Sequence, residues 1–224
     1  MDPADSRKLK KVLEILEVDL DKLHRGGGRR ILLSGGAACG KTALAKKIAK
    51  KYPNFRILNT GDIFREEARR RRISISGLMA EGGEALAELD RRVDKRALEI
   101  LISADEEIAV TSRLASLWGE ALKLAKIPCL SIYLEVSPFE MAERISIRDF
   151  GGPMKSLSKE KLSELREAIK RDWRDMTRYE AQYGANPLDF GKYALRINTT
   201  GALEEETWQK ADAFIRDYLK PKNA

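Results

Sequence analysis

The segment from residue 30 to residue 42 places the strongest constraint on how this chain can fold. It reads Arg-Ile-Leu-Leu-Ser-Gly-Gly-Ala-Ala-Cys-Gly-Lys-Thr, a short apolar run followed by the pattern Gly-x-x-x-x-Gly-Lys-Thr, and a helical sequence comes next. A strand, a glycine-rich turn and a helix in this order let backbone N–H groups and the positive helix end surround an anion. The sequence therefore predicts a phosphate-binding loop, or P-loop, that binds a nucleoside triphosphate.

The positions of this loop have distinct expected roles. Gly35 and Gly40 let the backbone turn around the anion because no Cβ stands in the way. Lys41 is expected to reach the β- and γ-phosphates, and the Thr42 hydroxyl is expected to bind Mg²⁺. The residues expected to surround the phosphates of ATP are Gly35, Gly36, Ala37, Ala38, Cys39, Gly40, Lys41, Thr42 and Ala43.

The length and composition are those of one globular domain. The chain has 224 residues, and its apolar content of 43% is enough for a sizeable core. No apolar run approaches the roughly 18 residues that a membrane-spanning helix needs, and the first residues lack an apolar signal core. Two cysteines, Cys39 and Cys129, make no disulfide framework. We therefore expect a cytoplasmic protein without a membrane partner.

The charge balance narrows the class of ligand. Lysine and arginine total 42 against 35 acidic residues, which gives a formal charge of +7. Aromatic residues make up only 7% of the chain and are not interleaved with basic ones, as they are in proteins that stack single-stranded nucleic acid. The composition therefore favours an enzyme that handles anionic nucleotides over a nucleic-acid-binding protein.

Strand-like and helical segments alternate along the rest of the chain. Such alternation predicts a parallel sheet covered by helices on both faces. We therefore expect an α/β, P-loop NTPase-type three-layer fold with about five parallel strands. The expected strands are 30–34, 55–59, 108–111, 130–136 and 193–198, and the main expected helical segments are 5–24, 61–103, 138–148, 158–183 and 202–218.

The residues before the P-loop strand read as an appendage. Leucines and a valine recur every three or four residues over 5–24, which predicts an amphipathic helix, and three glycines at 26–28 form a joint. We divide the chain into this helix and linker, 1–28, and a main domain, 29–224. The helix either packs on the outer face of that domain or makes a contact with a partner, as in a weak dimer. His24 is expected to cap its carboxyl end.

Two arginines follow predicted strands. Arg65 lies about one helical turn after the second strand, close to Thr60, and Arg113 follows the third strand. Ligands of open parallel sheets bind at the carboxyl ends of the strands, and a guanidinium group can hold a phosphate through two hydrogen bonds. These residues predict a second phosphate site beside the P-loop, with the helical region 61–103 as the acceptor-binding part.

Further arginines mark a possible lid from about residue 144 to residue 178. Arg144 and Arg148 lie on the helix before the Gly-Gly-Pro loop at 151–153. Arg171, Arg174 and Arg178 lie on the next helix, spaced three and four apart, so they are expected to share one face. Arginines delivered by closure of a lid would stabilise the charge on a transferring phosphoryl group and exclude water.

Several motifs in this order resemble those of nucleoside monophosphate kinases, most of all cytidylate kinases of the short archaeal type. The resemblance extends from about residue 30 to residue 219. Beyond the P-loop, the matching motifs are Thr-Gly-Asp-Ile-Phe-Arg at 60–65, Ser-Arg-Leu at 112–114, Leu-Glu-Val-Ser at 134–137, Arg-Asp-x-x-Asp-x-x-Arg at 171–178 and Asn-Thr-Thr at 198–200.

The resemblance implies transfer of the γ-phosphoryl group of ATP to CMP or dCMP, with Mg²⁺. It implies that Asn198 and Thr199 lie near the donor adenine, that Asp175 binds the sugar hydroxyl and that Glu135 contacts the base of the acceptor. The residues implied to hold the acceptor are Thr60, Asp62, Arg65, Arg113, Glu135, Arg171, Asp175 and Arg178.

One departure from the family pattern keeps two other hypotheses open. Members usually have an acid and a glycine before the arginine of the third strand, and this chain has Thr111 and Ser112. The first alternative is a kinase for another small acceptor, such as AMP or UMP. The second is a P-loop binding or assembly protein with slow ATPase activity, which engages RNA or protein through basic residues such as 69–72.

Overall fold

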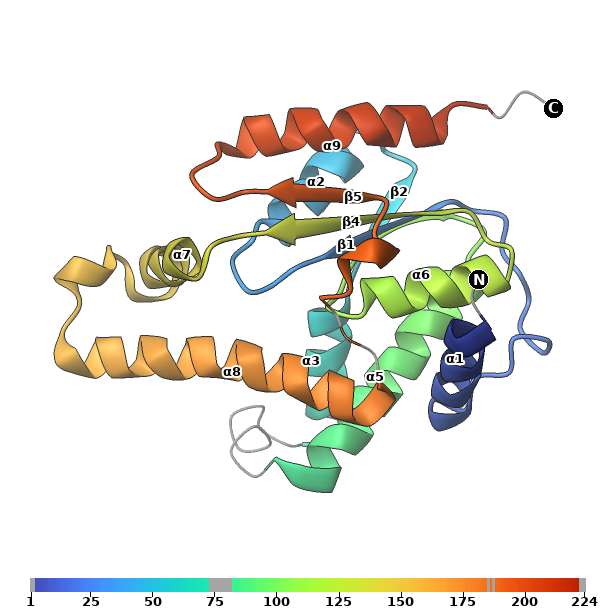
Figure 1. The fold of residues 1–224 in the computed structure, drawn as a ribbon, viewed down its shortest axis with the longest axis horizontal. Helices are drawn as coiled ribbons and strands as arrows, with labels where there is room; N and C mark the ends of the chain where they lie inside the picture. The colour runs from blue at the N-terminus through green and yellow to red at the C-terminus, as the bar shows by residue number, and fades with distance from the viewer. Residues whose placement is uncertain (1–2, 73–81, 185, 187, 222–224) are drawn as a thin grey trace.

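A five-stranded parallel sheet forms the centre of the protein (Figure 1). The computed structural model describes residues 3–72, 82–184, 186 and 188–221. The strands lie in the order β2-β3-β1-β4-β5, so the P-loop strand is central. This arrangement confirms the predicted α/β fold. The strands are β1 (Arg30–Ser34), β2 (Phe55–Asn59), β3 (Glu107–Thr111), β4 (Cys129–Glu135) and β5 (Leu195–Asn198).

The register of the sheet brings the functional segments to one edge. Leu33 on β1 pairs with Thr111 on β3 and with Ile132 on β4, and Asn59 on β2 also pairs with Thr111. Because all five strands are parallel, their carboxyl ends lie along the same edge. The P-loop and the segments that follow β2, β3 and β5 therefore meet there.

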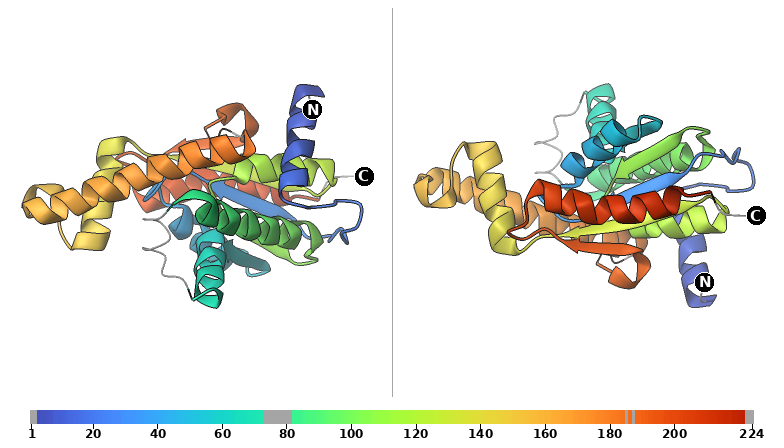
Figure 2. Two further views of the ribbon diagram at one scale, coloured as in Figure 1. Left: turned by 90° about the horizontal axis from the view of Figure 1, so that it is seen from below. Right: turned by 90° about the horizontal axis from the view of Figure 1, so that it is seen from above.

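Helices cover both faces of the sheet, as Figures 1 and 2 show. One apolar core joins β1 and β4 to α2 and α9, and a second, larger core lies on the opposite face with α1, α5 and α6. The sequence analysis named no helix between the third and fourth strands, where α6 buries Trp118. These helices and α3 span α2 (Lys41–Lys51), α3 (Thr60–Arg70), α5 (Gly83–Ser103), α6 (Ala115–Leu124) and α9 (Glu204–Leu219).

Two helices extend from one end of the sheet and form the predicted lid region. They are α7 (Pro138–Phe150) and α8 (Lys159–Tyr183), joined through a short 3₁₀ turn (Figure 1). Met141, Ile145 and Leu165 make a small core between them. The hydroxyls of Ser137 and Ser158 cap the two helices, as serine commonly does at this position.

The N-terminal helix differs from its prediction in length and in surroundings. It covers only Pro3–Ile15, and turns follow where the sequence predicted helix to residue 24. Its leucines, Leu9 and Leu13 among them, are buried in the larger core beside α5 and α6. The apolar side that suggested a dimer contact is therefore covered by the protein itself. His24 lies beyond the helix, with its Nε2 3.4 Å from Asp105, and does not cap it.

None of the helices in the described part of the chain is both long and apolar enough to cross a membrane.

Candidate active site

The P-loop has the backbone geometry that its glycines predict. Gly35 and Gly40 adopt positive φ values of 140° and 101°, and α2 begins immediately afterwards. A Cβ at Gly35 would lie 2.2 Å from the carbonyl oxygen of Leu134, so only glycine fits beside β4. Ala38 also has a positive φ, 52°, which is strained for a residue with a side chain. The loop thus holds its N–H groups in a fixed curve at the end of the sheet.

The side chains of Lys41, Thr42 and Cys39 have three different surroundings. The Lys41 ammonium group donates to the carbonyl oxygens of Gly35 and Gly36 at 2.7 and 2.6 Å, so it bridges the start of the loop. Thr42 is exposed in the first turn of α2. Cys39 is buried, with its sulfur 3.5 Å from the Lys41 nitrogen.

A pocket of about 390 Å³ opens beside the loop. Thr199 lines it, whereas the Asn198 side chain accepts a hydrogen bond from the Thr200 N–H and holds the turn after β5. Arg144 from α7 donates to the carbonyl oxygens of Thr199 at 2.6 Å and of Ala38 at 3.3 Å. Arg144 therefore joins the lid region to the P-loop and forms one wall of this pocket.

A second pocket, of about 290 Å³, collects the predicted acceptor residues from several elements. Thr60 donates to the carbonyl oxygen of Thr111 at 3.1 Å, which fixes the start of α3 against β3. Asp62 pairs with Arg65 and is not one of the lining residues. The residues that line the pocket are Thr60, Gly61, Phe64, Arg65, Asp90, Val93, Asp94, Arg113, Asp175, Arg178 and Tyr179.

The arginines of this pocket are held by carboxylates. Arg113 pairs with Asp172 and, at 2.9 Å, with Asp175. Burial by itself would lower the pKa of Arg113. The nearby carboxylates of Asp175 and Asp172 have the larger effect, and the pKa of Arg113 is raised. Arg178 donates to Asp90 at 2.6 Å and to Asp175 at 2.9 Å. A continuous row of ion pairs therefore connects the acceptor pocket to α8.

Asp172 extends this row to the P-loop. One of its oxygens accepts a hydrogen bond from the Ala37 N–H at 3.1 Å, and the residue is buried. A carboxylate of α8 thus contacts an N–H group of the anion-binding loop. The sequence analysis gave Asp172 no role, although it lies three residues before Asp175 and therefore near the same helix face.

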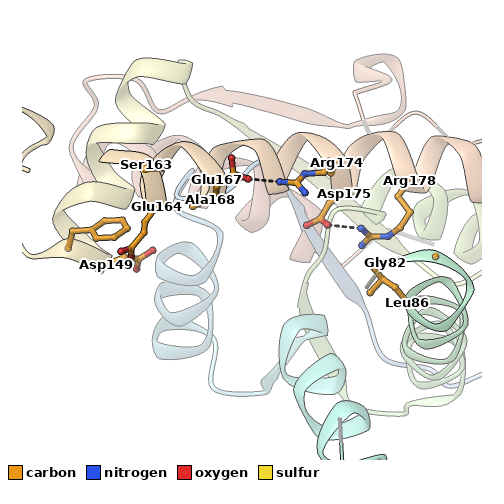
Figure 3. A pocket seen from close by; sticks show the side chains of 12 residues that line it. Gly82, Leu86, Asp149, Ser163, Glu164, Glu167, Ala168, Arg174, Asp175 and Arg178 are labelled. Atoms are coloured by element: carbon orange, nitrogen blue, oxygen red, sulfur yellow. Dashed lines mark hydrogen bonds and ion pairs between the residues drawn. The ribbon is translucent and has the colours of Figure 1, made fainter. Parts of the chain in front are cut away.

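The arginines of α8 do not form the single inward face that their spacing predicted. Arg178 points into the pocket, but Arg174 is exposed and pairs with Glu167 at 2.9 Å, as Figure 3 shows. The inward positions are taken by Asp172 and Asp175, because the buried charge of Arg113 requires carboxylate partners. The side chain of Arg171 lies outside the described residues.

Figure 3 shows the cleft of about 780 Å³ that α7, α8 and the start of α5 enclose. Arg174, Asp175 and Arg178 line it, so it is continuous with the acceptor residues. Arg148, in the last turn of α7, is exposed and pairs with Asp149 at 2.6 Å. The structure therefore does not bring Arg148 to the phosphate-binding residues.

Glu135 also lies away from the acceptor pocket. It pairs with Arg196 on the neighbouring strand, at 2.7 and 3.0 Å. It borders a separate pocket of about 230 Å³, which Trp173 and Met176 of α8 also line. Two acids that line the acceptor pocket beside the predicted Asp175, namely Asp90 and Asp94, were missed, because on the sequence they read as ordinary polar positions of a long amphipathic helix.

A P-loop at the end of the central strand of a helix-covered parallel sheet is the architecture of the P-loop NTPases. Solved structures show the same fold: a shikimate kinase from Bacteroides thetaiotaomicron has 18% identity and a TM-score of 0.52, covering 84% of this chain and 98% of that one. One from Acinetobacter baumannii has 17% identity and a TM-score of 0.50, covering 90% and 98%. The sequence family described as "AAA domain" matches residues 34–162, more than half of the chain.

The chain belongs to the cytidylate kinase family, in its archaeal form. The cytidylate kinase of Methanocorpusculum labreanum is 30% identical over 193 residues, which are 85% of this chain and 98% of that protein. The cytidylate kinase of Pyrococcus horikoshii is 30% identical over 191 residues, 85% of this chain and 90% of that protein. These relatives confirm the resemblance noted from the motifs, and the protein is an ATP-dependent nucleoside monophosphate kinase.

Proposed function

We propose that this protein transfers the γ-phosphoryl group of ATP to CMP or dCMP, giving ADP and CDP or dCDP. The observation that carries the proposal is the row of ion pairs that links the acceptor pocket to the P-loop. Arg113 lines the acceptor pocket and pairs with Asp172, which contacts the Ala37 N–H of the loop. Two phosphorylated ligands, one on each side of this row, would have their phosphates next to one another.

The chemistry asks the protein for positioning and charge neutralisation. The attacking group is an oxygen of the acceptor phosphate, which is already ionised, so no general base is needed. The P-loop and Lys41 would hold the donor phosphates, and Arg65, Arg113 and Arg178 would hold the acceptor phosphate in line with them. Arginines are suited to this because they bind phosphate through two parallel hydrogen bonds. The contact from Arg144 would keep α7 closed over the donor.

Magnesium fits the residues at the start of α2. Mg²⁺ commonly uses one or two protein oxygens together with waters and the phosphates of its nucleotide, and the exposed Thr42 hydroxyl next to Lys41 can serve as such an oxygen. Thr111, which replaces the family's strand-three acid, is buried. Within the described ranges there is no cluster of three His, Cys, Asp or Glu side chains that could hold a metal ion. When bound, Mg²⁺ would neutralise charge on the β- and γ-phosphates.

The basic run at residues 69–72 gives little support to an RNA-binding role. Arg70 pairs with Glu66 at 2.9 Å, and Arg71 pairs with Glu88 at 3.0 Å. Much of the local charge is therefore neutralised within α3 and α5. AMP and UMP carry the same phosphate group that Arg65, Arg113 and Arg178 would bind. The base of the acceptor must therefore be identified by experiment.

The test is a coupled turnover assay of ADP release with CMP, dCMP, UMP, AMP or no acceptor. We expect CMP and dCMP to give the highest kcat/KM and the sample without acceptor to give almost none. Lys41→Ala should lower kcat by roughly 10³, as removal of a single electrostatic stabiliser does in other enzymes. ADP release that is equally fast with and without acceptors would contradict the proposal and favour an ATPase.

A further inference from the structure

Two buried carboxyl groups of α5 line the acceptor pocket, and only Asp90, through Arg178, belongs to the row of ion pairs described above. Asp90 and Asp94 lie one helical turn apart on α5 and are only 2% and 3% exposed. Both line the acceptor pocket. Aspartate is almost never fully buried unless it is paired, so each of these groups needs a physical account.

The two groups are in different states. Burial raises the pKa of Asp90 as well, but Asp90 accepts a hydrogen bond from Arg178 at 2.6 Å, and this pairing favours its ionised form. Asp94 accepts one from the Tyr183 hydroxyl at 2.8 Å and has no cation as its partner. Burial, reinforced by the charge of Asp90, raises the pKa of Asp94 well above its ordinary range. Because Arg178 is ion-paired with Asp90 and no cation among the described residues pairs with Asp94, we assign Asp90 as the carboxylate, which can only accept, and Asp94 as the acid, which can donate.

The remaining oxygen of each group is available to a ligand. In the described part of the chain, the second oxygen of Asp90 and that of Asp94 have no hydrogen-bond partner. Neither oxygen is one of the fully buried side-chain atoms that lack a partner, so both can be reached from the pocket that the two residues line. Each group therefore presents one oxygen to a ligand in this pocket.

The surroundings of the pair suit a flat ring. Phe64 from α3 and Tyr179 from α8 line the same pocket, and aromatic side chains are favourable neighbours for planar ligands. The pocket of about 290 Å³ shares Asp175 and Arg178 with the larger cleft, so the hydrogen-bonding edge of the base, rather than its size, is what Asp90 and Asp94 would recognise.

We propose that Asp90 and Asp94 select the base of the acceptor nucleotide by binding the edge on which an amino group lies beside an unprotonated ring nitrogen. Cytosine has this edge. The Asp90 carboxylate would accept from the exocyclic amino group, and the Asp94 acid would donate to the ring nitrogen. Uracil places a carbonyl oxygen and a ring N–H at these two positions. The uracil carbonyl oxygen would then face the Asp90 carboxylate. Both groups can only accept, so no hydrogen bond could form between them. This inference rests on the proposed function.

The expected selectivity is large, because a site built for one hydrogen-bonding pattern leaves its buried groups unpaired with the other pattern. We expect the wild type to have a CMP-to-UMP ratio of kcat/KM on the order of 10² or more. Asp90→Asn introduces an amide that can donate to the uracil carbonyl, so this ratio should fall at least about tenfold. Asp94→Leu should lower kcat/KM for CMP and reduce the ratio as well.

A conservative variant separates recognition from packing. Asp94→Asn keeps the uncharged state, the shape, one donor and one acceptor, so it should retain most of the CMP preference that Asp94→Leu loses. Glu84→Gln is a matched control, since it removes a charge from an exposed position of the same helix. The Kd of ATP, measured for every variant, reports whether the fold and the donor site are intact.

Two results would overturn the inference, and they are distinguishable. If CMP is phosphorylated but Asp90→Asn and Asp94→Leu keep the wild-type CMP-to-UMP ratio, the pair does not read the base and the proposed function stands. If the wild type phosphorylates no nucleoside monophosphate, the proposed function fails and the inference fails with it. If Asp90→Asn no longer binds ATP, the CMP-to-UMP ratios of Asp94→Leu and Asp94→Asn are compared instead. Equal ratios in these two variants would overturn the inference.

Discussion

Asp172 is the residue through which α8 contacts the P-loop. Removal of its charge should tighten the binding of ATP. One of its oxygens accepts from the Ala37 N–H at 3.1 Å, while the residue also pairs with Arg113. A phosphate oxygen and the Asp172 carboxylate would compete for the same N–H group, because both are anionic acceptors. Asp172→Asn keeps the shape of the side chain and weakens it as a competitor.

The contacts set the size of this effect. A hydrogen bond to a charged group contributes about 1.5–3 kcal/mol, and one between neutral groups contributes about 0.5–1.5 kcal/mol. The difference of roughly 1–1.5 kcal/mol is what ATP gains when Asp172 becomes uncharged, and about 1.4 kcal/mol is a tenfold change in Kd. We therefore expect the Kd of ATP to fall about tenfold. Arg113 keeps Asp175 as a partner at 2.9 Å, so the fold should persist.

Calorimetric titration with ATP, in the absence of an acceptor, measures this Kd directly. Glu180→Gln is the matched control: it removes a charge from an exposed position of α8, away from the loop, and should leave the Kd unchanged. An Asp172→Asn variant that folds normally but binds ATP with the same or weaker affinity would refute the reasoning. In that case the carboxylate supports the donor site rather than competing for it.

Three further predictions concern stability. Ala38→Gly should raise the free energy of unfolding by about 0.5–1 kcal/mol, since it relieves the positive φ of 52°; a fall in Tm would contradict this. Arg30→Met should lower it by about 3 kcal/mol in urea unfolding, because the buried guanidinium donates to the carbonyl oxygens of Leu101 at 2.6 Å and Glu106 at 3.0 Å, which would lose their donor. Asp94 should make stability depend on pH: its folded-state pKa is raised, so its contribution is complete below about pH 3.8 and is lost as the pH rises towards the raised value. Asp94→Asn should remove this part of the pH dependence, and parallel stability curves for the two proteins would count against a neutral Asp94.

Local sequence was enough to predict the sheet and the loop. The apolar strand, the spaced glycines and Lys41-Thr42 are contiguous, and each position acts through its own backbone or through near neighbours. The same holds for the order of strands and helices, which follows from hydrophobic periodicity. The helix bounds were less accurate at the N-terminus, where the apolar spacing continues past Ile15 although the chain turns. Periodicity there reports burial, and burial does not require a helix.

The acceptor site was only partly predictable. Thr60, Arg65 and Arg113 could be named because they follow strands, and parallel strands bring such residues to one edge of the sheet. Asp90 and Asp94 could not be named, because their role depends on α5 packing against α3 and α8. Glu135 shows the reverse case: its motif matched the family, but its partner Arg196 lies on the adjacent strand, away from the pocket.

The face that α8 turns inward was decided only by the tertiary structure. Its sequence places three arginines and two aspartates in neighbouring rows along the helix. Their spacing shows which side chains share a face, but it does not show which face is buried. The choice depends on Arg113, more than fifty residues earlier in the chain, whose buried charge is held by Asp172 and Asp175. The sequence by itself therefore determined that this protein has a P-loop, a parallel sheet and the motifs of its family. Only the fold decided which charged groups meet, because the free energy of a buried charge depends on partners that are distant in sequence.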